Sequence, residues 1–288
     1  MNSATLSIVF GLTSAAVWGA GDFSGGVATK RNNVYTVVFG GHLVGLVGFV
    51  LLAILTGESW PIGMDFLFGG LAGLGGMIGV LAFYSSLARS TMGVVAPVTA
   101  IVNAIIPLIF AFLLEGLPPL LQMIGILIAL LAVWFLAGAS GITRANVHEF
   151  ALPALAGFGF AMFIVMIDRV SVGALYWPLA ASRMASLLVV TTIILTGVVR
   201  GVAAGRGAGM ARPTQLWLIA LSGILDSGGN AFFALAAQTG RLDIASILTS
   251  LYPASTVFLA WLILGERLTN SQKGGVVLTL VALVLITL

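Results

Sequence analysis

Apolar stretches long enough to cross a lipid bilayer follow one another along the whole chain. The hydrocarbon core of a bilayer is about 30 Å thick, so a spanning helix needs about 20 mostly apolar residues. Such stretches predict ten spanning helices, near residues 4–23, 34–56, 66–88, 92–114, 119–140, 150–168, 176–199, 214–237, 243–264 and 272–288. Most connections are short, except those around 140–149 and 200–213.

The amino-acid composition also requires that the lipid bilayer surrounds most of the protein. Of the 288 residues 60% are hydrophobic and only 7% are charged, against about a quarter in an ordinary soluble domain. A water-soluble protein of this size could not cover so much apolar surface. We therefore expect an all-α, multi-pass protein of the plasma (inner) membrane, with the lipid bilayer as a partner.

Several classes of function find no support in the sequence. The chain has no cysteine and only two histidines, His42 and His148, so we expect no metal site and no cofactor. It has no G-x-S-x-G, no paired-histidine motif and no nucleotide-binding P-loop, which argues against an enzyme. The basic residues lie mostly in short loops, so nucleic acid is not an expected partner.

Loop charges predict an orientation. The connections after odd-numbered spans hold nine basic residues: Lys30, Arg31, Arg89, Arg144, Arg200, Arg206, Arg212, Arg267 and Lys273. The connections after even-numbered spans hold two, Arg169 and Arg241. By the positive-inside rule, the odd connections are cytoplasmic and both termini lie outside.

The chain also contains an internal repeat. When the sequence is shifted by 149 residues, the segment from Ala82 falls on the segment from Ala231, with identical residues that include Phe83, Ala111 and Gly116. The halves, 1–143 and 144–288, would hold five spans each. Because five is odd, they would be inverted repeats around a central cavity, as in many secondary transporters.

Two segments carry a family resemblance: "AAVWGAGDF" in the first span, and the segment from Tyr252 that begins "YPASTVFLAWLILGERL". They resemble the ten-helix EamA-type members of the drug/metabolite transporter superfamily, which include aromatic amino-acid exporters. The residues of the second half that fit the family pattern are Pro253, Gly265, Glu266, Gln272 and Gly274. The first half departs from it, since Glu115 precedes Gly116 and Ala104 replaces the matching proline. The resemblance also implies a basic residue in the second helix of each half, where Arg183 fits and His42 stands in the first half.

The stretch "VWGAGDFSGG", residues 17–26, has the glycine content of a phosphate-binding loop. That motif must follow a strand and open a helix, whereas this one ends a hydrophobic span. Its spacing, Gly19-x-Gly21-x-x-x-Gly25, is typical of closely packed membrane helices. Asp22 is expected at the end of that span, as an interfacial residue, a cap or the mouth of a cavity.

Asp226 is the leading candidate for a functional charge because it lies near the middle of a predicted span. A carboxylate at that depth costs a few kcal/mol unless it faces a cavity or a partner. It would bind a substrate ammonium group, carry a coupling proton, or form a structural contact between helices. Asn230 lies one turn further on the same face. Gly228 and Gly229 would allow close approach or local unwinding.

Arg183 is the natural opposite charge for Asp226, although it lies shallow enough to snorkel to the interface. Nothing in the sequence establishes that the two residues meet. His42 is equally shallow; it either titrates near physiological pH or bonds to a carbonyl.

The remaining candidates are aromatic, polar and proline residues. Trp18, Tyr84 and Tyr252 would stack on an aromatic or cationic solute or simply pack. Hydrogen bonds to a solute or between helices would come from Asn103, Ser246, Thr249 and Ser250. Bends for gating would come from Pro97, Pro107 and Pro253.

These features predict a secondary transporter that exports a small metabolite. Its substrate would be an amino acid, including an aromatic one, or a drug-like compound, and protons would be coupled through Asp226. Alternatives are a passive facilitator or a lipid-handling protein of the same fold, and a membrane-embedded enzyme. The sequence does not decide between a monomer and a dimer.

Overall fold

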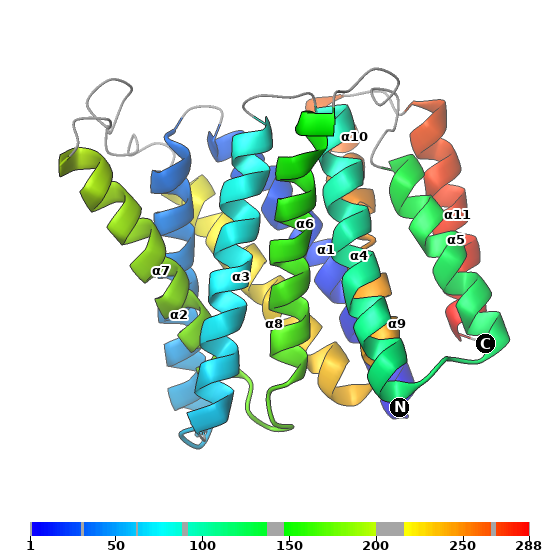
Figure 1. Ribbon diagram of the computed structural model, residues 1–288, viewed down its shortest axis with the longest axis horizontal. Helices are drawn as coiled ribbons and strands as arrows, with labels where there is room; N and C mark the ends of the chain where they lie inside the picture. Colours follow the sequence, from blue (N-terminus) through cyan, green and yellow to red (C-terminus); the bar gives the residue numbers. More distant parts are fainter. Residues whose placement is uncertain are drawn as a thin grey trace.

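The computed structural model contains helices and no strands in the residues that it describes, which are 2–29, 32–61, 63–87, 92–136, 147–199, 216–265 and 269–287. The helices are α1 (Ser3–Thr29), α2 (Val34–Thr56), α3 (Gly63–Leu87), α4 (Met92–Glu115), α5 (Leu120–Leu136), α6 (Val147–Asp168), α7 (Tyr176–Val199), α8 (Leu216–Thr239), α9 (Leu242–Thr249), α10 (Tyr252–Leu264) and α11 (Asn270–Thr287). The start of α1 and the end of α11 lie at the same end of the helix bundle, with the connections that follow α2, α4, α6 and α8 (Figure 1). We call this the termini end.

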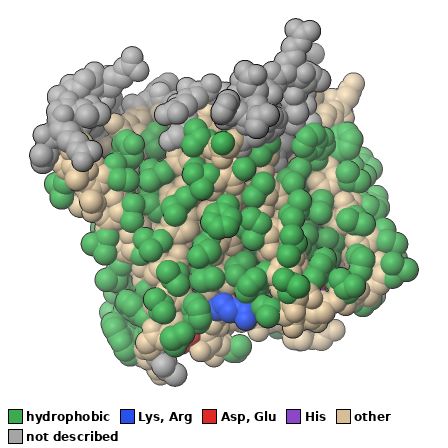
Figure 2. Space-filling model, viewed as in Figure 1, with side chains coloured by type: hydrophobic (Ala, Val, Ile, Leu, Met, Phe, Trp, Pro, Cys, Tyr) green, Lys and Arg blue, Asp and Glu red, His purple; other side chains and the backbone are tan. Residues whose placement is uncertain are grey.

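The helices have the length and surface of a membrane protein. Eight stretches of the described residues are long and apolar enough to span a bilayer, and Leu120–Leu136 and Asn270–Ile286 are shorter apolar helices. Hydrophobic side chains cover most of the described face in Figure 2, where basic side chains come to the surface only near the lower edge. The chain is therefore a multi-pass membrane protein.

Most helices begin and end within a few residues of the predicted spans, but α1 is longer. The prediction that Asp22 ends the first span is wrong, because the helix continues to Thr29. The extra turns pack closely: Gly21, Ser24 and Gly25 are buried, and a Cβ atom on Gly21 would lie 3.2 Å from the backbone nitrogen of Asp226 in α8. Asp22 consequently lies within a helix wall of the bundle. The close packing predicted for these glycines is confirmed at Gly19, where a Cβ atom would lie 2.6 Å from that of Ser255.

The span predicted at 243–264 is divided into α9 and α10. The Thr249 and Ser250 hydroxyls donate to the carbonyls of Ala245 and Ser246, the residues four positions earlier. The Leu251 amide bonds three residues back, to Leu248. Pro253 has no N–H group and lies in the first turn of α10, where a helix tolerates proline. The Ser250 amide still donates to the Ser246 carbonyl, so the ladder of α-helical hydrogen bonds is interrupted from Leu251 onward.

The principal helix contacts join residues before and after position 144. α1 packs on α8 and α10, α2 on α7 and α8, α3 on α6 and α7, α4 on α6 and α9, and α5 on α11. Glycine allows several of these contacts: a Cβ atom on Gly159 of α6 would lie 2.7 Å from the Cα of Gly79 in α3. Side chains that converge from both halves of the chain can therefore meet between the helices.

We expect Gly73→Ala to destabilise the fold and Gly70→Ala, in the same helix, to leave it nearly unchanged. A Cβ atom on Gly73 would lie 2.7 Å from the Cα of Ser182 in α7, whereas one on Gly70 would meet nothing within 4 Å. Overpacking of this kind costs about 1–3 kcal/mol. The thermal stability of the two variants would be compared by heating the detergent-purified proteins and then measuring, by size-exclusion chromatography, how much folded protein remains. Equal thermal stability would contradict the close α3–α7 contact.

Candidate functional site

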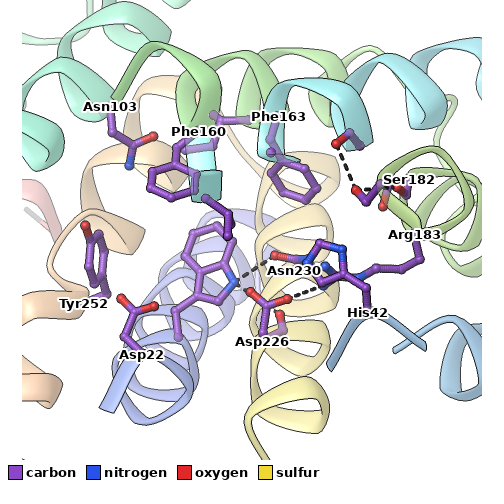
Figure 3. Close-up of a pocket in the computed structure, with 16 residues that line it drawn as sticks. Asp22, His42, Asn103, Phe160, Phe163, Ser182, Arg183, Asp226, Asn230 and Tyr252 are labelled. Carbon is purple, nitrogen blue, oxygen red and sulfur yellow. Dashed lines mark hydrogen bonds and ion pairs between the residues drawn. The ribbon is translucent and has the colours of Figure 1, made fainter. Parts of the chain in front are cut away.

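An open cavity lies between helices of both halves of the chain. Its volume is about 680 Å³, including space continuous with solvent. The lining comes from eight helices: Trp18, Asp22, His42, Gly73, Gly76, Val80, Asn103, Phe160, Phe163, Ile164, Ser182, Arg183, Ser186, Asp226, Asn230 and Tyr252. Acidic, basic, amide and aromatic groups thus face one space inside an apolar bundle (Figure 3).

An ion pair crosses one side of this cavity. An Nη atom of Arg183 in α7 donates a hydrogen bond to an Oδ atom of Asp226 in α8. The Arg183 side chain is 6% exposed and that of Asp226 is 41% exposed. The guanidinium carbon also lies 5.9 Å from the centre of the Phe49 ring. The pair that the sequence could not establish is formed, with its acidic member accessible from the cavity.

Buried polar atoms without hydrogen-bond partners lie behind the ion pair. Within the described residues, these include Nδ1 of His42, Nε of Arg183 and the Ser227 hydroxyl. A Cβ atom on Gly45 would lie 3.1 Å from the Arg183 Nε, so this glycine lets α2 approach the arginine. An unmade hydrogen bond of a buried group costs about 1–3 kcal/mol. Where α2, α7 and α8 meet, these polar atoms therefore remain available for further hydrogen bonds.

Trp18 is held rather than free to move. Its Nε1 donates to the Asn230 side-chain oxygen at 2.8 Å and to the Asp226 carbonyl at 3.2 Å. Its ring stacks on that of Phe233, with ring centres 6.0 Å apart. Gly229 leaves the space that the indole occupies, since a Cβ atom there would lie 2.7 Å from the Trp18 Cγ. Trp18 therefore forms a fixed wall of the cavity.

Replacing Trp18 with phenylalanine is expected to destabilise the protein. The variant keeps an aromatic ring but removes the donor to Asn230, which is only 5% exposed. Leaving a buried acceptor unsatisfied costs about 1–3 kcal/mol. Trp217→Phe is the matched control, because Trp217 is 60% exposed. Detergent thermal unfolding would compare the two, and equal midpoints would contradict the assigned role of the indole N–H.

Not every candidate from the sequence reaches the cavity. Thr249, Ser246 and Ser250 are buried, and their hydroxyls donate to backbone carbonyls of their own helix. Gly228 and Gly229 lie within the continuous helix α8, so local unwinding there is not observed. Pro107 lies within α4. The side chains of Tyr84 and Pro97 lie outside the described residues.

Sequence reasoning missed other lining residues. Phe160 and Phe163 of α6 give the cavity an aromatic side, and Ser182 and Ser186 flank Arg183 on α7. Ser186 stands three residues after Arg183, on the same helix face, which is a usable signal, whereas Ser182, one residue before it, gives none. The phenylalanines resemble any apolar residues of a span and offer none. Within the described residues, no group of three or more His, Cys, Asp or Glu side chains could hold a metal ion.

Glu58 joins the two halves of the chain at the termini end. It follows α2, and its carboxylate accepts hydrogen bonds from the amides of Leu175, Tyr176 and Trp177 at 2.9, 2.7 and 3.2 Å. These amides begin α7, where a helix has unsatisfied donors and a partial positive charge. Nearby, Asp65 accepts from the Ser171 amide at 2.8 Å.

Arg241 makes a second connection at this end. Its Nη2 donates to the Gly116 carbonyl at 2.6 Å and to the Asp243 carboxylate at 2.8 Å, and its Nε lies 3.7 Å from Glu115. The hydrogen bond to Asp243 raises the pKa of Arg241, so the guanidinium stays charged. We call the contacts of Glu58, Asp65 and Arg241 the closing network.

A hydrophobic cluster separates the closing network from the cavity residues. Phe49, Phe233, Leu179 and Leu242 are nearly inaccessible and belong to one buried cluster. Phe233 lies seven residues beyond Asp226 toward the termini end of α8, about 10 Å at 1.5 Å per residue. The cavity is therefore shut on that side by apolar packing backed by charged contacts.

Comparison with known proteins agrees with this architecture. Residues 5–138 and 150–288 each match the profile of the EamA-like transporter family. A crystal structure of another protein superposes with a TM-score of 0.75 at 13% sequence identity, covering 100% of this chain and 97% of that one, which shows a common fold. A search of curated proteins finds no match.

Proposed function

Because the chain belongs to the EamA-like transporter family, we propose that it is a secondary active transporter that exports a small metabolite by alternating access. The observation that carries this proposal is the cavity with its Arg183–Asp226 pair, lined from both family-matching segments and shut toward the termini end. A second functional class, an enzyme, has no comparable support.

The lining supports an amino acid, including an aromatic one, or a drug-like compound as the solute. Arg183 and Asp226 offer opposite charges, and Trp18, Phe160 and Phe163 offer aromatic surface. An α-amino acid carries both charges close together. A neutral lipid would leave these polar groups unsatisfied, so lipid handling is the weaker alternative.

The proposed topology has ten spans in two inverted repeats, 1–143 and 144–288, with α9 and α10 as one broken span. Of the basic residues behind the proposed orientation, Lys273 lies in α11 and most others lie outside the described residues. The loop charges support both termini outside, in a plasma membrane. In that orientation the conformation described above is closed toward the outside.

Proton coupling through Asp226 is part of the proposal. While Asp226 is paired with Arg183, its carboxylate is occupied by the guanidinium group. When the helices separate, or when a substrate carboxylate takes its place on Arg183, Asp226 becomes free to accept a proton. One protonation would thereby accompany each movement of the pair.

Solute exchange in proteoliposomes tests the proposed function. A thermal-shift screen with amino acids and organic cations would first name a ligand, because binding to the folded state stabilises it. Labelled ligand should then exchange against unlabelled ligand inside the vesicles, and an imposed pH gradient should drive its accumulation. Exchange without accumulation would indicate a passive facilitator, and the absence of both would refute the transport proposal.

A further inference from the structure

Asp22 differs from the other acidic residues whose side chains the structure describes. The structure describes the side chains of seven of the nine acidic residues, all except Glu149 and Glu266. Six of these seven have a hydrogen bond or an ion pair: Glu58, Asp65, Glu115, Asp168, Asp226 and Asp243. Asp22 has neither among the described residues, so its carboxylate is free to bind a ligand.

The surroundings of Asp22 form a site rather than open surface. Asp22 lies seven residues before the end of α1 and one turn after Trp18, and both residues line the cavity. Figure 3 shows its carboxylate beside Tyr252, on the opposite side of the cavity from Arg183. Arg183 is already engaged by Asp226. The described lining therefore contains one carboxylate more than its arginine neutralises.

We propose that Asp22 binds the ammonium group of an organic amine whose aromatic body lies against the aromatic wall of the same cavity. This inference rests on the proposed function and assigns the substrate's positive group to Asp22 rather than to Asp226. A cation close to an unpaired carboxylate satisfies it, and rings such as Tyr252 and Trp18 attract the same cation through their faces. A neutral solute of the same shape would leave the carboxylate unpaired.

Binding of a matched pair of probes to the purified protein tests the assignment. The probes are 2-phenylethylamine, which is protonated at neutral pH, and 2-phenylethanol, a neutral analogue of the same size. Isothermal titration in detergent should show that the wild-type protein binds the amine at least tenfold more tightly than the alcohol. Asp22→Asn should weaken amine binding at least tenfold and leave alcohol binding nearly unchanged.

Two variants control for a general loss of charge. Asp168→Asn removes a carboxylate that pairs with Arg169 outside the cavity lining, and it should bind the amine as the wild type does. Asp22→Glu keeps the charge on a longer side chain and should retain a preference for the amine. If Asp22→Asn does not fold, carbodiimide labelling of the wild-type protein replaces it, and the amine should then protect Asp22 from modification more than Asp168.

Three results would overturn the assignment: equal affinity of the wild type for amine and alcohol, no amine binding at all, or unchanged amine binding by Asp22→Asn with Asp22 unprotected. These results are distinct from failure of the transport proposal. Asp22-dependent binding without any exchange in vesicles would refute transport and keep the site. Exchange that is independent of Asp22 would support transport and refute the assignment of the ammonium site to Asp22.

Discussion

Replacing Asp226 with asparagine is expected to abolish accumulation of solute driven by a pH gradient, while exchange of labelled for unlabelled solute continues. Asparagine has nearly the same shape and can still accept a hydrogen bond from Arg183, but it cannot gain or lose a proton. The coupling step would be lost and the path for the solute kept. Proteoliposomes with and without an imposed pH gradient measure both activities in the same preparation.

The Arg183–Asp226 contact complicates this variant in a predictable way. Removing Asp226 leaves the buried Arg183 charge without its partner, at a cost below the about 3–5 kcal/mol of a fully buried pair because Asp226 faces the cavity. A poorly folded Asp226→Asn would therefore lose exchange as well. The double variant Arg183→Gln/Asp226→Asn removes both charges and should recover folding but not accumulation. Accumulation that survives in either variant would exclude Asp226 as the coupling residue, and Asp168→Asn should behave as the wild type.

Replacing Glu58 with glutamine is expected to shift the protein toward a conformation that is open at the termini end. The carboxylate accepts three backbone hydrogen bonds at the start of α7, and glutamine supplies one neutral acceptor instead. Hydrogen bonds to charged groups contribute about 1.5–3 kcal/mol. Because every 1.4 kcal/mol is a factor of ten, the open population should rise roughly 10- to 100-fold.

The absence of cysteine makes this shift measurable. Ala180 of α7 is 1% exposed and lies in the cluster between the closing network and the cavity, so Ala180→Cys provides the one reactive thiol of the chain. Its labelling by a maleimide should be slow with Glu58 present and at least tenfold faster in Glu58→Gln. Asp168→Asn, which alters a carboxylate whose ion pair among the described residues is with Arg169, serves as the control. Unchanged labelling would mean that the contacts of Glu58 do not hold this end closed.

The spans could be predicted from the sequence because each depends on a local property. About 20 apolar residues in a row decide where a helix crosses the membrane, and α2 begins and ends at the predicted residues, 34–56. The ends of α1 and the break after α9 could not be predicted so well. The end of α1 depends on glycine contacts with α8, and the break depends on the change to three-residue hydrogen bonds from Leu251 onward, which only packing and local geometry decide.

The candidate site could be predicted only in part. Asp226 stood out because a charge within a span is costly, and Arg183 stood out as its natural opposite charge. Their contact joins residues 43 positions apart on different helices, and no local pattern encodes that. Asp22 was misjudged because its position depended on how far α1 continues. Glu58 was missed because its partners are backbone amides, which every sequence has.

Backbone contact between helices also bears on how this bundle can move. Where Gly41 and Gly223 let α2 and α8 touch, the nearest atoms on both sides belong to the backbone. A change of angle there requires few new rotamers, whereas larger side chains would have to disengage and repack. We therefore expect α2 and α8 to change their crossing angle at this contact. Adding a methyl group at this glycine contact should slow the conformational cycle even where the resting structure tolerates it.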